Sequence, residues 1–147
     1  MFLKTTEYAL RAVIYIAQKS SDENKLGLTE IARAIDSPQS FTAKILQQLT
    51  SGNKIISSVR GPNGGFYISD KSKKLPVHAI LKAMGEDEIL KKCVLGLKLC
   101  SETKPCPMHA EYKLIKPQLI KMFEMRTIQD LADAIDNGDV FISNQNK

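Results

Sequence analysis

The spacing of apolar positions changes once along the chain and then changes back. Between residues 5 and 51, apolar side chains recur about every three or four positions, which predicts helices. The segments 54–59 and 65–69 are rich in β-branched and aromatic residues and predict two strands. Helical spacing returns after residue 77. The order helix, short helix, turn, helix, hairpin predicts a mainly α fold, a winged helix-turn-helix with a small β-hairpin wing.

Three helices are expected before the hairpin. Thr5 or Thr6 is the expected N-cap of the first helix, and Thr29 is the expected N-cap of the second. The segment 36–38 contains a proline and breaks the chain before a third helix over residues 39–51. The side chains expected to face the core are Ala9, Ala12, Val13, Ile16, Ala17, Ile31, Ala32, Ile35, Phe41, Ile45, Leu46 and Leu49.

The second half is predicted to be helical around an irregular segment. Helices are expected over residues 77–84 and 112–126, and Pro117 must kink the latter or stand at the first position of a later start. Thr127 is expected to cap a final helix that turns Leu131, Ala132 and Ile135 inward. We expect a DNA-binding domain over 1–75, a cysteine-loop sensor and helical dimerisation region over 76–137, and a loose polar tail over 138–147.

The positive charge is concentrated in the first half of the chain. The 147 residues carry a net charge of +5. Residues 1–80 hold eleven Lys/Arg and six Asp/Glu, whereas residues 81–147 hold ten of each. A basic half joined to a neutral half indicates a polyanion-binding module. The chain shows no signal peptide and no apolar run of membrane-spanning length, so we expect no membrane association and a cytoplasmic protein with reduced thiols.

The third predicted helix offers polar side chains for reading bases. In a helix-turn-helix the first turn of the second helix lies nearest the major groove. Here that turn presents Gln39, Ser40, Thr42 and Lys44, on the face away from Phe41. Glutamine can bind adenine through two hydrogen bonds, and Ser and Thr can donate or accept. The alternative is that these residues only solvate an exposed helix face.

The turn of the predicted hairpin is the second candidate contact with DNA. Arg60 is the side chain best suited to a narrow, electronegative minor groove. Gly61, Asn63 and Gly64 favour a tight turn and allow the backbone to approach a groove wall closely. Together with the preceding helix-turn-helix, this turn indicates that double-stranded DNA is the partner.

Three motifs are similar to those of a known family. TTEYALRAVIYIA, TEIARAIDSPQSFTAKILQQL and SSVRGPNGGFYIS resemble the Rrf2 family of bacterial transcription regulators, over about Leu3 to Ile135. The resemblance implies a regulator, here expected to be a repressor, and not an enzyme. It also implies a homodimer in which the long C-terminal helix crosses to the partner, and a palindromic operator.

All three cysteines lie within one short segment. Cys93, Cys100 and Cys106 are followed by His109, and prolines flank Cys106 on both sides. Soft thiolates suit an iron–sulfur cluster or zinc, and an odd number of cysteines argues against a disulfide framework. The residues alone leave open a cluster, a structural Cys3His zinc site, bare redox-sensing thiols, or small hydrophobic side chains in a packed helix. A small metal-dependent or thiol enzyme with His109 as base is a further, weaker alternative.

The family resemblance implies an iron–sulfur cluster, [2Fe–2S] or [4Fe–4S], in this segment. Cys93, Cys100 and Cys106 match the three cluster cysteines of IscR-like and NsrR-like members, although the first spacing is one residue longer here. His109 matches the histidine that completes the IscR-like set. Glu7 matches the acid that ligates from the other subunit in NsrR-like members. The expected signal is nitric oxide, redox state or iron–sulfur status. The alternative for His109 is a surface histidine without a ligand role. The alternative for Glu7 is an acidic residue in the first helical turn that interacts favourably with the helix dipole.

Overall fold

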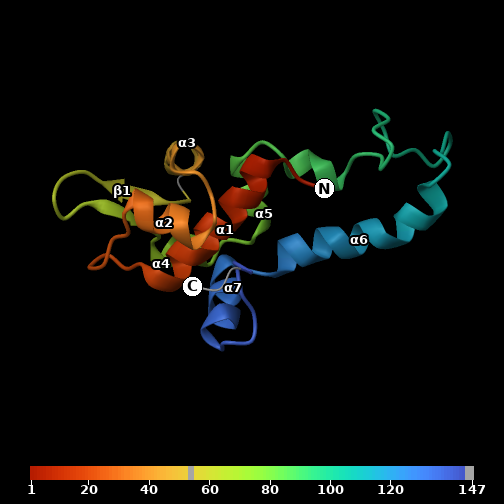
Figure 1. Cartoon of the computed structure of the whole chain (residues 1–147). Coiled ribbons are helices and arrows are strands. Elements are labelled where there is room, and N and C mark those ends of the chain that lie inside the picture. Colours follow the sequence, from red (N-terminus) through yellow and green to blue (C-terminus); the bar gives the residue numbers. More distant parts are fainter. Residues whose placement is uncertain (53–54, 145–147) are drawn as a thin grey trace.

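Helix α1, Lys4–Lys19, forms the centre of the molecule in the computed structural model, which describes residues 1–52 and 55–144. Around it lie α2, Leu28–Ala34, and α3, Gln39–Thr50. They are followed by the antiparallel pair β1, Ser57–Val59, and β2, Gly65–Tyr67. Figure 1 shows the hairpin extending from this helical body. The predicted mainly α fold with a hairpin wing is therefore confirmed.

One hydrophobic core joins the first half of the chain to its last helix. Apolar faces of α1, α2 and α3 meet buried residues that follow β2 and residues of the final helix α7, Ile128–Asp136. Their fully buried large side chains are Ile16, Ile31, Ile35, Ile45, Leu46, Leu49, Ile55, Ile56, Ile68, Ile80, Leu81 and Leu90. None of the described helices is long and apolar enough to cross a membrane.

The first two helices begin earlier than their threonines predict. The residues before them are Leu3 and Gly27, and neither gives a side-chain cap. Thr6 is instead fully buried and donates to Glu86 Oε1 at 2.5 Å, while Thr29 Oγ1 accepts from Gln39 Nε2 at 3.0 Å. The predicted caps at Thr5 or Thr6 and at Thr29 are therefore wrong, because both helices begin before these residues.

The first turn of α3 differs from the prediction, whereas Ile45, Leu46 and Leu49 are buried as expected. Phe41, expected in the core, is 48% exposed, whereas Thr42, expected on the reading face, is fully buried. The hydroxyl of Thr42 lies 2.9 Å from both the Pro38 carbonyl oxygen and Ser37 Oγ. Burial of Thr42 is therefore tolerated because its polar group is satisfied within the preceding turn. Thr42 is not available to read bases.

The wing is tightened by glycine and extended by a bridge. Val59 pairs with Gly65 at the turn end of the hairpin, and Phe66 forms a further bridge with Leu26 before α2. A Cβ added at Gly64 would lie 2.1 Å from the Val59 carbonyl oxygen, so this position requires glycine. The strands are shorter than expected: Ile55 and Ile56 precede β1 as buried residues, and Lys54 lies outside the described residues. Ser69 caps the short α4, Asp70–Lys73, which the apolar pattern does not predict.

The second half of the chain extends away from the helical body and then returns to it through α6, His109–Met125. Helix α5, His78–Ala83, and the 3-10 helix η1, Asp87–Leu90, lead into an irregular loop. Helix α6, His109–Met125, then runs back to the body, starting three residues before the expected position. Pro117 lies inside α6, which continues on both sides of it. Figure 1 shows the loop at the far end of α6 and α7 packed beside α1.

Two residues in the described part of the predicted tail contact the body, while residues 138–141 are exposed. Ile142 packs on the core, and Ser143 Oγ donates to Asp36 Oδ2 at 2.5 Å. Asp36 occupies the turn between α2 and α3 with a φ of 56°, a conformation that aspartate tolerates better than most residues. The tail therefore contacts the turn between α2 and α3.

The capping box at α7 is confirmed and gives a stability prediction. Thr127 Oγ1 accepts from the Asp130 N–H at 3.1 Å, and Asp130 Oδ2 accepts from the Thr127 N–H at 2.9 Å. We expect Thr127→Ala to lower the free energy of unfolding by about 1 kcal/mol in urea denaturation. Thr127→Ser keeps the hydroxyl and serves as the control. An unchanged midpoint in Thr127→Ala would contradict the role of this cap.

The same capping box predicts that the stability of the protein depends on pH. The backbone and side-chain hydrogen bonds of Thr127 lower the pKa of Asp130. A carboxyl whose pKa is lower in the folded state stabilises the protein above its unfolded value, near 3.8, and loses this contribution as pH falls through its lower folded value. We expect Asp130→Asn to be less stable than wild type at pH 7, and the difference to vanish below the folded pKa of Asp130.

Candidate functional site

The outward face of α3 carries polar and aromatic side chains. Gln39, Ser40 and Lys44 are exposed, as predicted, and Gln47 extends this face by one turn. A shallow surface pocket here is lined by Ser40, Phe41, Ala43, Lys44 and Gln47. The phenyl ring of Phe41, at this surface, adds an apolar group of the kind that contacts thymine methyls in the major groove.

A cluster of aromatic and basic side chains on α1 lies next to Phe41. The Tyr8 and Phe41 ring centroids are 6.5 Å apart. The Arg11 guanidinium lies 4.8 Å and the Lys4 ammonium 5.5 Å from the centre of the Tyr8 ring. These cations stand beside the reading helix and can contribute to phosphate binding. The apolar pattern gives no signal for them, because their positions depend on how α1 packs against α3.

The wing tip presents the residues expected there. Arg60, Gly61 and Asn63 are exposed, and Gly64 is half-buried by its contact with Val59. The N–H of Gly64 donates to the Gly61 carbonyl at 2.9 Å and closes the turn. Arg60 therefore projects from a compact turn rather than from an extended loop.

The three cysteines lie in the irregular loop between η1 and α6. All are free thiols, with Cys93 buried and Cys100 and Cys106 half-buried. Cys93 is 6% exposed, and all three cysteines lie outside the described helices. The alternative of small hydrophobic side chains in a packed helix therefore does not describe this loop.

The surroundings of the Cys93 thiol lower its pKa. The N–H of Leu95 has the largest effect in lowering the pKa of Cys93, those of Leu97 and Gly96 act in the same direction, and burial opposes them. Burial raises the pKa of Cys106, and its neighbours Cys93 and Cys100 raise it further. Cys93 and Cys106 interact directly through their thiols. The pKa of the Cys93 thiol is therefore lowered and that of the Cys106 thiol raised, and these two thiols lie next to each other.

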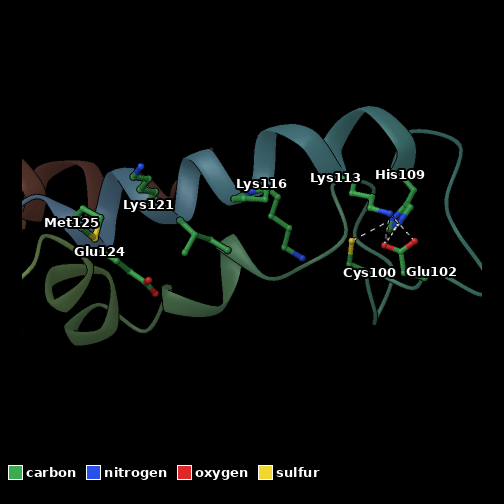
Figure 2. Close-up of a pocket in the computed structure, with 10 residues that line it drawn as sticks. Cys100, Glu102, His109, Lys113, Lys116, Lys121, Glu124 and Met125 are labelled. Atoms are coloured by element: carbon green, nitrogen blue, oxygen red, sulfur yellow. Dashed lines mark hydrogen bonds and ion pairs between the residues drawn. The ribbon is translucent and has the colours of Figure 1, made fainter.

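Cys100 belongs to a second group at the start of α6. Its Sγ lies 3.5 Å from His109 Nδ1, and Glu102 Oε1 lies 3.4 Å from His109 Nε2. Lys113 Nζ is 3.0 Å from the same Glu102 oxygen. Lys113 and then His109 lower the pKa of Glu102, which keeps it a carboxylate. Figure 2 shows these side chains at one end of a pocket that follows α6 to Met125.

The donor set of this loop fits an iron–sulfur cluster. Within residues 1–52 and 55–144, no three His, Cys, Asp or Glu side chains stand close enough together to hold a single metal ion. Thiolates are nevertheless the ligand type that iron–sulfur clusters use. N–H groups directed at a sulfur are a recognised feature of such sites. His109 Nε2 is buried and, within the described residues, its nearest polar contact is the 3.4 Å approach of Glu102 rather than a hydrogen bond.

Glu7 lies on α1, apart from the thiol loop of its own chain. It is in the first turn of α1 and pairs with Lys4 at 3.7 Å, with 44% of its side chain exposed. Figure 1 shows the start of α1 near the body and the loop at the far end of α6. Within one chain, only His109 of the two candidate fourth ligands contacts a cysteine.

The order of the helices and the hairpin define a winged helix-turn-helix fold. The model of the Rrf2 family, described as iron-dependent transcriptional regulators, matches residues 2–134. The chain belongs to this family, which comprises regulators of transcription and not enzymes.

Relatives and solved structures agree with this assignment. A putative HTH-type transcriptional regulator of Aquifex aeolicus is 32% identical over 89% of this chain and 90% of its own. The regulator NsrR of Oceanobacillus iheyensis is 26% identical over 87% of this chain and 86% of its own. The structure of CymR, the global cysteine regulator of B. subtilis, has a TM-score of 0.71 at 16% identity, covering 91% of this chain and 97% of that one. For T. potens IscR the TM-score is 0.69 at 14% identity, covering 95% and 91%.

Proposed function

We propose that the chain is a homodimeric repressor whose affinity for a palindromic operator is set by an iron–sulfur cluster bound to Cys93, Cys100 and Cys106. The observation that carries this proposal is that three free thiols lie in one loop between η1 and α6, with Cys100 Sγ 3.5 Å from His109 Nδ1. Nitric oxide, oxidants or a shortage of iron would act on the cluster. A regulator of bacterial transcription works beside the DNA, in the cytoplasm.

The exposed surface of α6 supports a dimer. Four large apolar side chains of this helix are between 51% and 71% exposed: Leu114, Ile115, Met122 and Met125. A second copy of α6 would remove this apolar surface from water, which is favourable. The arm-like position of α6 in Figure 1 allows it to reach across to a partner.

The contact between the cysteine loop and α6 would allow cluster binding to change the position of the DNA-binding elements. Lys116 of α6 donates to the Lys91 carbonyl oxygen at 2.6 Å, beside Cys93. Closing the loop on a cluster would fix this end of α6 and, through the dimer, the separation of the two reading helices. Half-sites lie about one helical turn apart, near 34–36 Å, so a change in separation costs contacts in both halves.

The proposal is tested by purifying the protein without oxygen. We expect a brown protein that absorbs in the visible and contains iron and acid-labile sulfide rather than zinc. Stoichiometric zinc without colour would favour the structural zinc site. A colourless, metal-free protein that still responds to oxidants would favour bare thiols, for which the 3.5 Å contact between Cys100 and His109 is the supporting feature. Either result would contradict the proposal.

A further inference from the structure

We infer that Phe41 determines part of the operator sequence, because its ring contacts the 5-methyl group of one thymine in the major groove, and that Tyr8 of α1 supports this ring. The inference rests on the DNA-binding part of the proposed function and does not depend on the cluster. It names the base that the exposed apolar side chain of α3 selects, and it adds a residue outside the helix-turn-helix pair to the reading surface.

Phe41 lies at the edge of the buried face of α3. Thr42, Ile45, Leu46 and Leu49 are buried, whereas Phe41 is 48% exposed. An apolar ring that is half in water gains free energy when another apolar surface covers it. The first turn of the second helix of a helix-turn-helix lies nearest the base edges. Apolar groups on those edges are therefore the ones that Phe41 meets.

Thymine is the base whose major-groove edge matches this ring. Among the four bases of unmodified DNA, only thymine carries a methyl group there, and phenylalanine is one of the side chains that contact it. Ser40, Lys44 and Gln47 recur at helical spacing beside the ring, and with Phe41 they line one shallow pocket. Their polar groups can bind the edges of neighbouring base pairs while the ring contacts the methyl group.

Tyr8 gives the phenyl ring a support that is present before DNA binds. The two ring centroids are 6.5 Å apart and the rings are inclined by 47°. Aromatic pairs attract each other at centroid distances of about 4.5–7 Å. Tyr8 is half-buried and packs on the hydrophobic core, so its own position is fixed by the body of the protein. A side chain that is already oriented loses less entropy on binding.

The charge around Phe41 favours DNA over a second protein as the occupant of this surface. The Arg11 guanidinium lies 4.8 Å and the Lys4 ammonium 5.5 Å from the centre of the Tyr8 ring. Lys44 lines the pocket itself, and no acidic side chain does so among the described residues. One exposed ring surrounded by cations and polar groups is also a small apolar area for a stable protein interface.

The test selects a DNA duplex from a random-sequence library with the wild-type protein. Each thymine of the selected duplex is then replaced in turn by deoxyuridine, which lacks only the 5-methyl group, and affinity is measured by fluorescence anisotropy. At one thymine in a half-site, we expect the replacement to weaken wild-type binding by about fourfold, the effect of one buried methyl group. Phe41→Ala should bind the selected duplex more weakly and should bind the thymine and deoxyuridine forms equally. Phe41→Leu keeps an apolar side chain and should retain a smaller preference for thymine.

Two further positions separate the support of the ring from a general loss of aromatic surface. Tyr8→Ala removes the support and should reduce the preference for thymine, whereas Tyr8→Phe keeps the ring and should preserve it. Phe141→Ala is the matched control, because it removes a phenyl ring that is 75% exposed in the predicted tail. It should show the full wild-type preference. Circular dichroism on each variant shows that the fold is retained.

The outcomes distinguish this inference from the proposed function. A selected duplex in which no deoxyuridine replacement changes the affinity of wild type overturns the inference alone. A preference for thymine that is as large in Phe41→Ala and Phe41→Leu as in wild type also overturns it, and an unchanged preference in Tyr8→Ala overturns the supporting role of Tyr8. A selection that enriches no duplex, with either the cluster-containing or the cluster-free protein, overturns the proposed operator binding itself.

Discussion

Replacing Cys106 with Ser is expected to remove the visible absorption of the anaerobically purified protein and reduce its iron content to near zero. A serine hydroxyl is a harder and less acidic ligand than a thiol and binds iron–sulfur clusters poorly. Cys106 is half-buried in the loop and lies outside the hydrophobic core, so the fold should survive. We expect the free energy of unfolding of the apo proteins to change by no more than about 0.5 kcal/mol.

The control for this variant is Lys98→Ala, an exposed position between two of the cysteines. It should keep both colour and iron. Iron is measured by colorimetric assay and stability by urea denaturation of both apo proteins. A Cys106→Ser protein with a full complement of iron would contradict the assignment of Cys106 as a ligand, and a protein that fails to fold would contradict its peripheral place.

Replacing Arg60 with Ala is expected to weaken operator binding by about 10- to 100-fold while leaving the colour unchanged. Arg60 is exposed on a wing tip closed by the Gly61–Gly64 hydrogen bond, where its guanidinium can enter a minor groove. Loss of one such contact costs about 1–3 kcal/mol. If Arg60 binds phosphate rather than base edges, the slope of the logarithm of affinity against the logarithm of salt concentration should also become smaller by about one.

Lys82→Ala is the matched control, because it removes one exposed positive charge from α5 rather than from the wing. It should leave affinity within a few-fold of wild type. Fluorescence anisotropy with an operator duplex, over a series of salt concentrations, measures both variants. Simultaneous loss of colour and DNA binding in Arg60→Ala would contradict the division between reading elements and cysteine loop.

The main elements of the fold are predictable because each has a local signal. Helical spacing gives α1, α2 and α3, and the glycine-rich turn 60–64 gives the hairpin. The capping box at Thr127 is predicted with the correct residues, since both of its hydrogen bonds lie within four positions. Such signals need no knowledge of what packs against them.

The errors occur where tertiary contacts decide between two neighbouring positions. Phe41 and Thr42 are both compatible with the apolar stripe of α3, and hydrophobicity favours burial of Phe41. The structure buries Thr42 because the turn before α3 accepts its hydroxyl, and it places Phe41 against Tyr8. Thr6 likewise binds Glu86, 80 positions away, which no local pattern predicts.

The candidate site also has one part that the sequence predicts and one part that depends on the tertiary structure. The short spacing of the cysteines predicts that they share one loop, as they do. The contacts of His109 with Cys100 and Glu102, by contrast, depend on where α6 begins, and α6 begins at His109 rather than at Tyr112. Pairing of Glu102 with Lys113 follows from that same start.

The central claim, that a cluster in the loop sets operator affinity, is tested most directly by comparing holo and apo protein on the same operator. Both forms are prepared from one anaerobic batch, with the apo form made by chelation, and titrated over a salt series. The account predicts that the affinities of the two forms differ by about tenfold or more at every salt concentration. Rebuilding the cluster in the apo protein should restore the affinity of the holo form. Equal affinities of the two forms throughout the series would contradict it.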